Sequence, residues 1–157
     1  MSLPGFVKYR KQKTAPHNMI SPSPNRAWIN RETLFLLAFA LMMTHELDAV
    51  ARLEWRVLPV TSWMPDDVGF HVFVAAHVPL VLALVHWAWR AGEVTGERLR
   101  FWFCAFCVVH VGLHWVFQGH PEYRFNNPFS NALIWGCGAA GLAWLAATVL
   151  SRPQRVP

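Results

Sequence analysis

Four long apolar stretches, separated by short polar segments, dominate the hydrophobic pattern of this chain. Their expected bounds, in chain order, are residues 30–59, 68–89, 99–117 and 129–150. Each approaches or exceeds the ~20 residues that an α-helix needs to cross a ~30 Å hydrocarbon layer. Asn30 is a suitable N-cap for the first stretch, and the acidic pair Asp66–Asp67 suits the start of the second. The pattern predicts an all-α fold, an integral membrane four-helix bundle.

The helical stretches divide the chain into three parts. Residues 1–29 form a basic, proline-rich tail, residues 30–150 form the four-helix domain, and residues 151–157 form a short second tail. The first tail has no apolar run of signal-peptide length, so it does not predict a cleaved targeting segment.

The composition supports a membrane protein. Apolar residues make up 54% of the chain and charged residues 15%, whereas soluble domains carry about 25% charged residues. This argues against a soluble enzyme and excludes a disordered chain. The three cysteines lie inside apolar stretches, which predicts buried thiols rather than a disulfide scaffold.

The basic residues predict the orientation in the membrane. With four crossings both termini share one side, and eleven of the fourteen Lys and Arg residues fall there. The other three are Arg52, Arg56 and Arg124. Since basic residues collect on the cytoplasmic side, we expect both termini to be cytoplasmic. The net charge of +5 is then a topology signal, and we expect no nucleic-acid partner.

Ionisable residues within the spans gather at one depth, near the side opposite the termini. They come from three of the four stretches and the loop after the third: His45, Glu46, Asp48, His71, His77, His110, His114 and His120. Such residues are costly in lipid, so they usually face the bundle interior and serve a function. His86 lies at the other end of the second stretch and is an exception.

Helical spacing indicates a metal site. His110 and His114 are four residues apart, which lets two imidazoles bind one ion. His45 and Asp48 are three apart and share a helix face. Three imidazoles with a carboxylate suit zinc, with a water in an open position for hydrolysis.

We therefore expect the following roles. The predicted ligands are His45, His77, His110 and His114, with Asp48 as a further ligand or as a supporting partner. Glu46, next to a predicted ligand, is the expected general base, and Asp48 is also a candidate catalytic residue. The residues expected to support the ligands or to hold a second metal are His71, His120 and Arg52.

Simpler interpretations remain open. The histidines could hydrogen-bond between helices without a metal. Asp48 and Arg52 could form an ion pair of the i, i+4 type. Glu54 is expected to be an interfacial surface residue or a partner of Arg56. The loop after the third stretch either covers the site or only connects two helices.

Two motifs resemble a known family. The segments T-H-E-L-D-A-V (44–50) with E-W-R-V-L-P (54–59), and H-x-x-x-H-x-x-F-x-x-H-P (110–121), look like those of a family of small, uncharacterised bacterial multi-pass membrane proteins. The resemblance implies a bacterial inner (plasma) membrane location. A looser similarity exists to intramembrane zinc hydrolases of the alkaline ceramidase type, which also combine H-x-x-x-H with further His and Asp but have seven spans.

Three functions are compatible with these features. The first is a zinc-dependent hydrolase acting on a membrane lipid or other amphiphile at the extracytoplasmic side. The second is a redox protein that binds haem or two iron ions, because facing histidines in a four-helix bundle can hold such groups. The third is a non-catalytic protein, either a homo-oligomer or an accessory subunit of a membrane complex.

The orientation is open to a direct test. After Arg155, a fused reporter that works in the cytoplasm should be active and one that works only in the periplasm should be inactive. The reason is that the basic residues flank the terminal side of the bundle. Fusions of a phosphatase reporter and a fluorescent reporter at this position measure it. A periplasmic signal would overturn the predicted topology.

Overall fold

The computed structural model describes residues 30–90 and 92–151. Within them the chain forms four α-helices and one 3-10 turn: α1 (Arg31–Ala51), η1 (Glu54–Arg56), α2 (Asp66–Trp89), α3 (Glu93–Phe117) and α4 (Pro128–Leu150). All four α-helices are long and apolar enough to cross a membrane. The predicted all-α four-helix architecture of a multi-pass membrane protein is confirmed. The expected tails, residues 1–29 and 152–157, lie outside the described residues.

Two of the expected helix bounds are wrong. The first helix does not continue to residue 59 but ends at Ala51, and Leu53 then adopts a left-handed backbone conformation (φ 61°). This conformation reverses the chain into η1. The third helix begins at Glu93 rather than near residue 99, because its polar first turns extend beyond the apolar stretch and an acidic residue stabilises a helix N-terminus.

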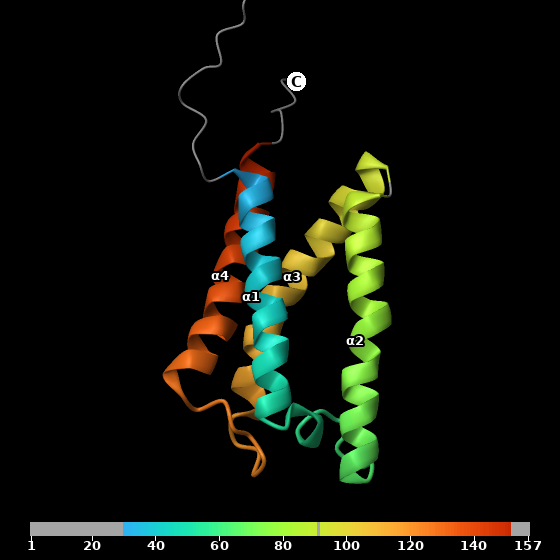
Figure 1. Cartoon of the computed structure of the whole chain (residues 1–157). Helices are drawn as coiled ribbons and strands as arrows, with labels where there is room; N and C mark the ends of the chain where they lie inside the picture. Colours follow the sequence, from blue (N-terminus) through green and yellow to red (C-terminus); the bar gives the residue numbers. More distant parts are fainter. Residues whose placement is uncertain (1–29, 91, 152–157) are drawn as a thin grey trace, which may run out of the picture.

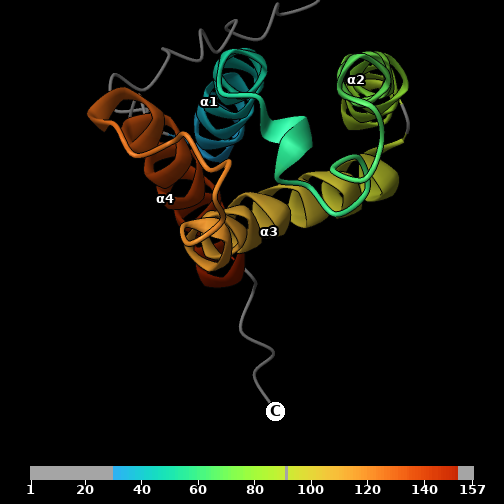
Figure 2. The ribbon, with the colours of Figure 1, turned by 90° about the horizontal axis from the view of Figure 1, so that it is seen from below.

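The helices are packed unevenly. α4 lies along both α1 and α3, whereas α2 contacts mainly α3 and η1. Figure 1 shows α2 standing apart from α1 and α4, with α3 running obliquely from the top of α2 to the lower ends of the other two. Seen from below, η1 lies between α1 and α2 (Figure 2). The oblique path of α3 brings its second half beside the end of α1.

Small residues allow the close packing of α4 on α3. A Cβ atom added at Gly141 would lie 2.7 Å from the carbonyl oxygen of Cys104, and one added at Gly138 would lie 2.5 Å from a methyl group of Val111. The three cysteines at this contact are free and fully buried, as predicted. The α3–α4 interface therefore fixes the position of α3.

The opposite end of the bundle is held by charged side chains. Arg31 on α1 forms an ion pair with Glu97 on α3 and lies over the ring of Trp144 on α4. Arg100 also approaches Glu97 and donates a hydrogen bond to the carbonyl oxygen of Ala88. These contacts join all four helices near the end that carries the chain termini.

Replacing Gly141 tests the close helix contact. Gly141→Ala should lower the free energy of unfolding by about 1–3 kcal/mol, because the new methyl group meets backbone and forces the helices apart. Gly112→Ala is the matched control, since no described residue outside its own helical turns lies within 4 Å of the added Cβ. Thermal unfolding in detergent, followed by circular dichroism, measures both. Equal stability of the two variants would contradict the packing described here.

Candidate metal centre

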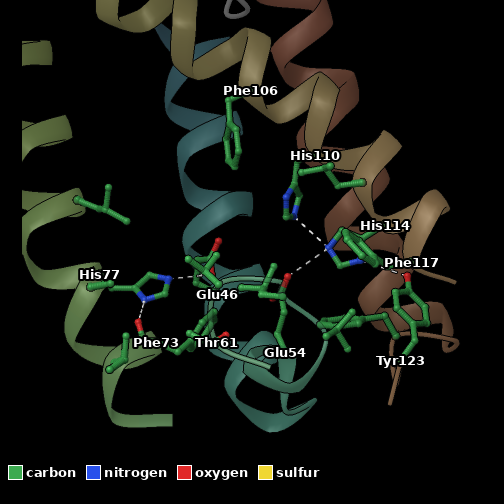
Figure 3. A pocket seen from close by; sticks show the side chains of 18 of the residues that line it. Glu46, Glu54, Thr61, Phe73, His77, Phe106, His110, His114, Phe117 and Tyr123 are labelled. Carbon is green, nitrogen blue, oxygen red and sulfur yellow. Dashed lines mark hydrogen bonds and ion pairs between the residues drawn. The ribbon is translucent and has the colours of Figure 1, made fainter. Parts of the chain in front are cut away.

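Three buried histidine rings converge at the lower end of the bundle. The Nε2 atom of His114 lies 3.2 Å from Nε2 of His45 and 3.1 Å from Nε2 of His110. One ligand atom from each ring falls within 4.8 Å of the others, and all three residues are buried. Figure 3 shows His110 and His114 projecting from α3 into this space. We call these three residues the histidine cluster.

The helix geometry explains why the rings meet. His110 and His114 are one turn apart on the face of α3 that its tilt directs toward α1. His45 lies on the buried face of α1, opposite them. The ring of Phe125, from the loop before α4, packs at 5.5 Å from the His45 ring and 4.8 Å from the His114 ring. The cluster is thus shielded by an apolar side chain.

The spacing of the cluster fits a small metal ion. Zinc–nitrogen bonds of about 2.0–2.1 Å in a tetrahedral site place neighbouring nitrogens about 3.3 Å apart, close to the separations around His114 Nε2. A ligating histidine usually has a hydrogen-bond partner for its other nitrogen. His114 has one, since its Nδ1 lies 3.2 Å from the hydroxyl of Tyr123. His45 Nδ1 is buried and has no hydrogen-bond partner among the described residues.

Glu54 lies beside the histidine cluster. Its carboxylate oxygens are 3.9 Å from His45 Nε2 and 4.0 Å from His114 Nε2, and the residue is 7% exposed. The expectation that Glu54 is a surface residue or a partner of Arg56 is therefore wrong. The left-handed turn at Leu53 folds Glu54 back beneath α1, whereas a continuous helix would have carried it outward.

Arg56, the expected partner, pairs elsewhere. Its guanidinium donates hydrogen bonds of 2.6 and 2.7 Å to Asp66 and lies 3.6 Å from Glu122. Burial, together with the nearby charges of Glu46 and Asp48, raises the pKa of Glu54 to about 8. A cation among the histidines would oppose this shift, because a bound metal stabilises the carboxylate form.

The loop between α3 and α4 covers the cluster. Besides Phe125 it supplies Tyr123, whose hydroxyl contacts His114 and whose pKa is raised by burial and by the charge of Glu54. This loop was expected either to cover the site or to connect two helices, and the structure shows that it covers the site. Sequence reasoning missed Tyr123 because no periodic pattern assigns loop side chains to a face.

Glu46 and His77 form a second polar group nearby. Their side chains are 2.9 Å apart and join α1 to α2, as Figure 3 shows. His77 Nδ1 lies 2.7 Å from the carbonyl oxygen of Phe73, which can only accept a hydrogen bond. Nδ1 therefore carries a proton, and the contact between Nε2 and Glu46 must share one further proton. The structure thus brings together three of the four predicted histidine ligands and places the fourth, His77, against Glu46.

The remaining predicted residues lie outside the cluster. Asp48 accepts hydrogen bonds from Arg52, at 3.1 Å, and from the hydroxyl of Ser130, so the i, i+4 ion pair is confirmed. His71 is exposed, and its Nδ1 donates to the carbonyl oxygen of Asp67. His120 accepts a hydrogen bond from the backbone of Glu122 within its loop.

A cavity of about 420 Å³ adjoins the histidine cluster. It lies against α2, α3 and the two loops at this end of the bundle, and most of its wall is apolar. Its polar lining residues are Glu46, Glu54, Thr61, His77, His110, His114 and Tyr123. The arrangement therefore combines a possible three-nitrogen metal site, two carboxylates and a chamber large enough for a small apolar ligand.

Comparison with known proteins adds a family but no activity. No curated protein and no solved structure matches the chain, so these comparisons give the resemblance to ceramidase-type hydrolases no support. Residues 31–151, which include all four helices and the whole histidine cluster, match the model of a family of unknown function (DUF6713). The chain therefore belongs to the DUF6713 family.

Proposed function

We propose that this protein is a metal-dependent membrane hydrolase of the zinc type, acting on a lipid or other amphiphile at the extracytoplasmic face of a bacterial inner membrane. One observation carries the proposal. Three buried imidazole nitrogens converge with Glu54 4.0 Å or less from two of them, and His110, His114 and Glu54 line an apolar cavity. Three histidines with a further position are the donor set of many hydrolytic zinc sites.

His45, His110 and His114 hold the ion in this proposal, and Glu54 lies beside the fourth position, which a water molecule would occupy. A zinc ion there lowers the pKa of water to about 7 and polarises a carbonyl group. Tyr123 orients the His114 ring through its contact with Nδ1. Phe125 keeps bulk water from the rings that it covers.

Glu46 is the general base. It lines the cavity, and because its Oε2 atom shares a proton with His77, its other oxygen, Oε1, takes up the water proton. A water oxygen forms a bond to the acyl carbon of the substrate while Glu46 accepts the water proton. The bond from that carbon to the leaving oxygen or nitrogen then breaks, and the proton is returned to the leaving group. The products are an acid and an alcohol or amine.

The clustered geometry favours a single small ion over haem. A haem iron takes axial ligands from opposite faces of a flat ring, whereas the three Nε2 atoms here converge on one point. The carboxylates at the cavity wall favour hydrolysis over a purely structural role, because a structural zinc site is usually closed by its four ligands.

Removal of a cluster histidine should abolish metal binding. His45→Ala and His114→Ala should each reduce metal content from about one ion per chain to a small fraction, because two nitrogens alone hold zinc weakly. His86→Ala is the control, since His86 lies at the other end of α2, outside the cluster. Elemental analysis of detergent-purified protein measures the ion. Unchanged metal in both cluster variants, or a Soret absorption band in the wild type, would refute the zinc site.

Loss of the base should separate catalysis from metal binding. Glu46→Gln should keep its metal but hydrolyse reporter-labelled ester and amide amphiphiles about 10²–10⁴-fold more slowly, the usual contribution of a general base. Glu122→Gln changes a partly exposed side chain that does not line the cavity and should retain full activity. Hydrolysis at wild-type rates by the Glu46 variant would exclude it as the base.

A further inference from the structure

The cavity beside the histidine cluster has two apolar walls with helical spacing. Val72, Ala76 and Leu80 recur every four residues along α2 and line the cavity. Phe106 and Leu113 line it from α3, on the same helix face as His110. Two facing apolar stripes thus lead away from the polar wall.

Side chains in these apolar walls are partly exposed at the outer surface of the helices. Leu80 is 64% exposed, Phe106 45% and Leu113 41%. All three lie within helices that are long and apolar enough to span a membrane. At that depth the surrounding medium is hydrocarbon, so the opening between α2 and α3 admits an apolar chain from the side.

The polar and apolar parts of the cavity specify the occupant chemically. Glu46, Glu54, His110 and His114 supply polar groups to its wall, and aliphatic and aromatic side chains form most of the rest. An occupant that satisfies both parts carries a polar carbonyl group attached to a long apolar chain. The volume of about 420 Å³ lies in the lower part of the ~300–1,000 Å³ range of ligand pockets, which favours one chain over two.

We infer that the substrate is a single-chain amphiphile that enters from the hydrocarbon layer between α2 and α3. Its acyl chain lies between the two apolar stripes, and its ester or amide carbonyl lies beside Glu46 and the histidine cluster. This inference rests on the proposed function for the bond that is cut, and deepens it by naming the substrate class. Ala76, at the centre of the α2 stripe, then determines whether the chain fits.

Photo-crosslinking tests the occupant without requiring hydrolysis. The full chain, purified in detergent, is irradiated with a palmitic acid analogue that carries a diazirine on its chain, and labelled residues are mapped by mass spectrometry. We expect labelling of the cavity-lining residues of α2 and α3 that excess palmitic acid removes. Ala76→Trp should reduce this labelling by about tenfold or more, because the indole occupies the volume of the chain.

Ala75→Trp is the matched control. Ala75 is the exposed neighbour on α2 but does not line the cavity, so labelling should stay at the wild-type level. A phosphatidylcholine probe with the same diazirine should label outward-facing residues of α2 and α3 without saturation, and equally in both variants. Equal cavity labelling in the Ala76 and Ala75 variants, or saturable cavity labelling by the two-chain probe, would overturn the inference.

The labelling experiment tests the lipid site independently of the proposed metal-dependent hydrolysis. His45 does not line the cavity, so His45→Ala should lose the metal and still be labelled by the palmitic acid probe. Saturable labelling of a wild-type protein that contains no metal would refute the hydrolase and leave the lipid site. A metal-loaded wild-type protein without saturable cavity labelling would refute the single-chain occupant alone.

Discussion

The burial of three imidazole rings and a carboxylate inside an apolar bundle is the constraint on which this structure depends. Polar groups removed from water cost several kcal/mol unless they are paired. Here Nε2 of His114 faces two other ring nitrogens, and Glu54 approaches two of the rings without a hydrogen bond to either. A shared cation would interact with all three nitrogen lone pairs and with the carboxylate, which no rearrangement of protons among the rings achieves.

Two irregular features of the bundle, the turn at Leu53 and the oblique path of α3, bring these buried polar groups together. The left-handed conformation of Leu53 costs about 1–2 kcal/mol for a non-glycine residue, and it is the turn that brings Glu54 to the cluster. The oblique path of α3 brings His110 and His114 to α1 and leaves α2 apart from α1 and α4 (Figure 2). The same tilt therefore assembles the histidine cluster and leaves the cavity beside it.

The sequence predicted those features that depend on periodicity. Four apolar stretches gave the four helices, and the i, i+4 spacing with the common depth gave His45, His110 and His114. Glu54 was missed because no glycine or proline marks the break after Ala51, so the helical pattern seemed to continue. The partner of His77 was also missed. Both Glu46 and His77 were predicted as site residues, but the position of α2 that brings His77 to Glu46 depends on tertiary packing.

Glu54 and Glu46, the two carboxylates near the cluster, differ in whether their surroundings let them take up a proton. Glu54 lies 3.9–4.0 Å from two ligand nitrogens, so a cation there would hold it in its charged form and keep it from taking up a proton. Glu46 is instead paired with His77, whose other nitrogen is fixed as a donor by the Phe73 carbonyl, so this pair already shares one proton. The pair also joins α1 to α2 at the cavity wall. In the proposed reaction, an amphiphile that enters between α2 and α3 would therefore meet the free oxygen of Glu46 beside the proposed metal position.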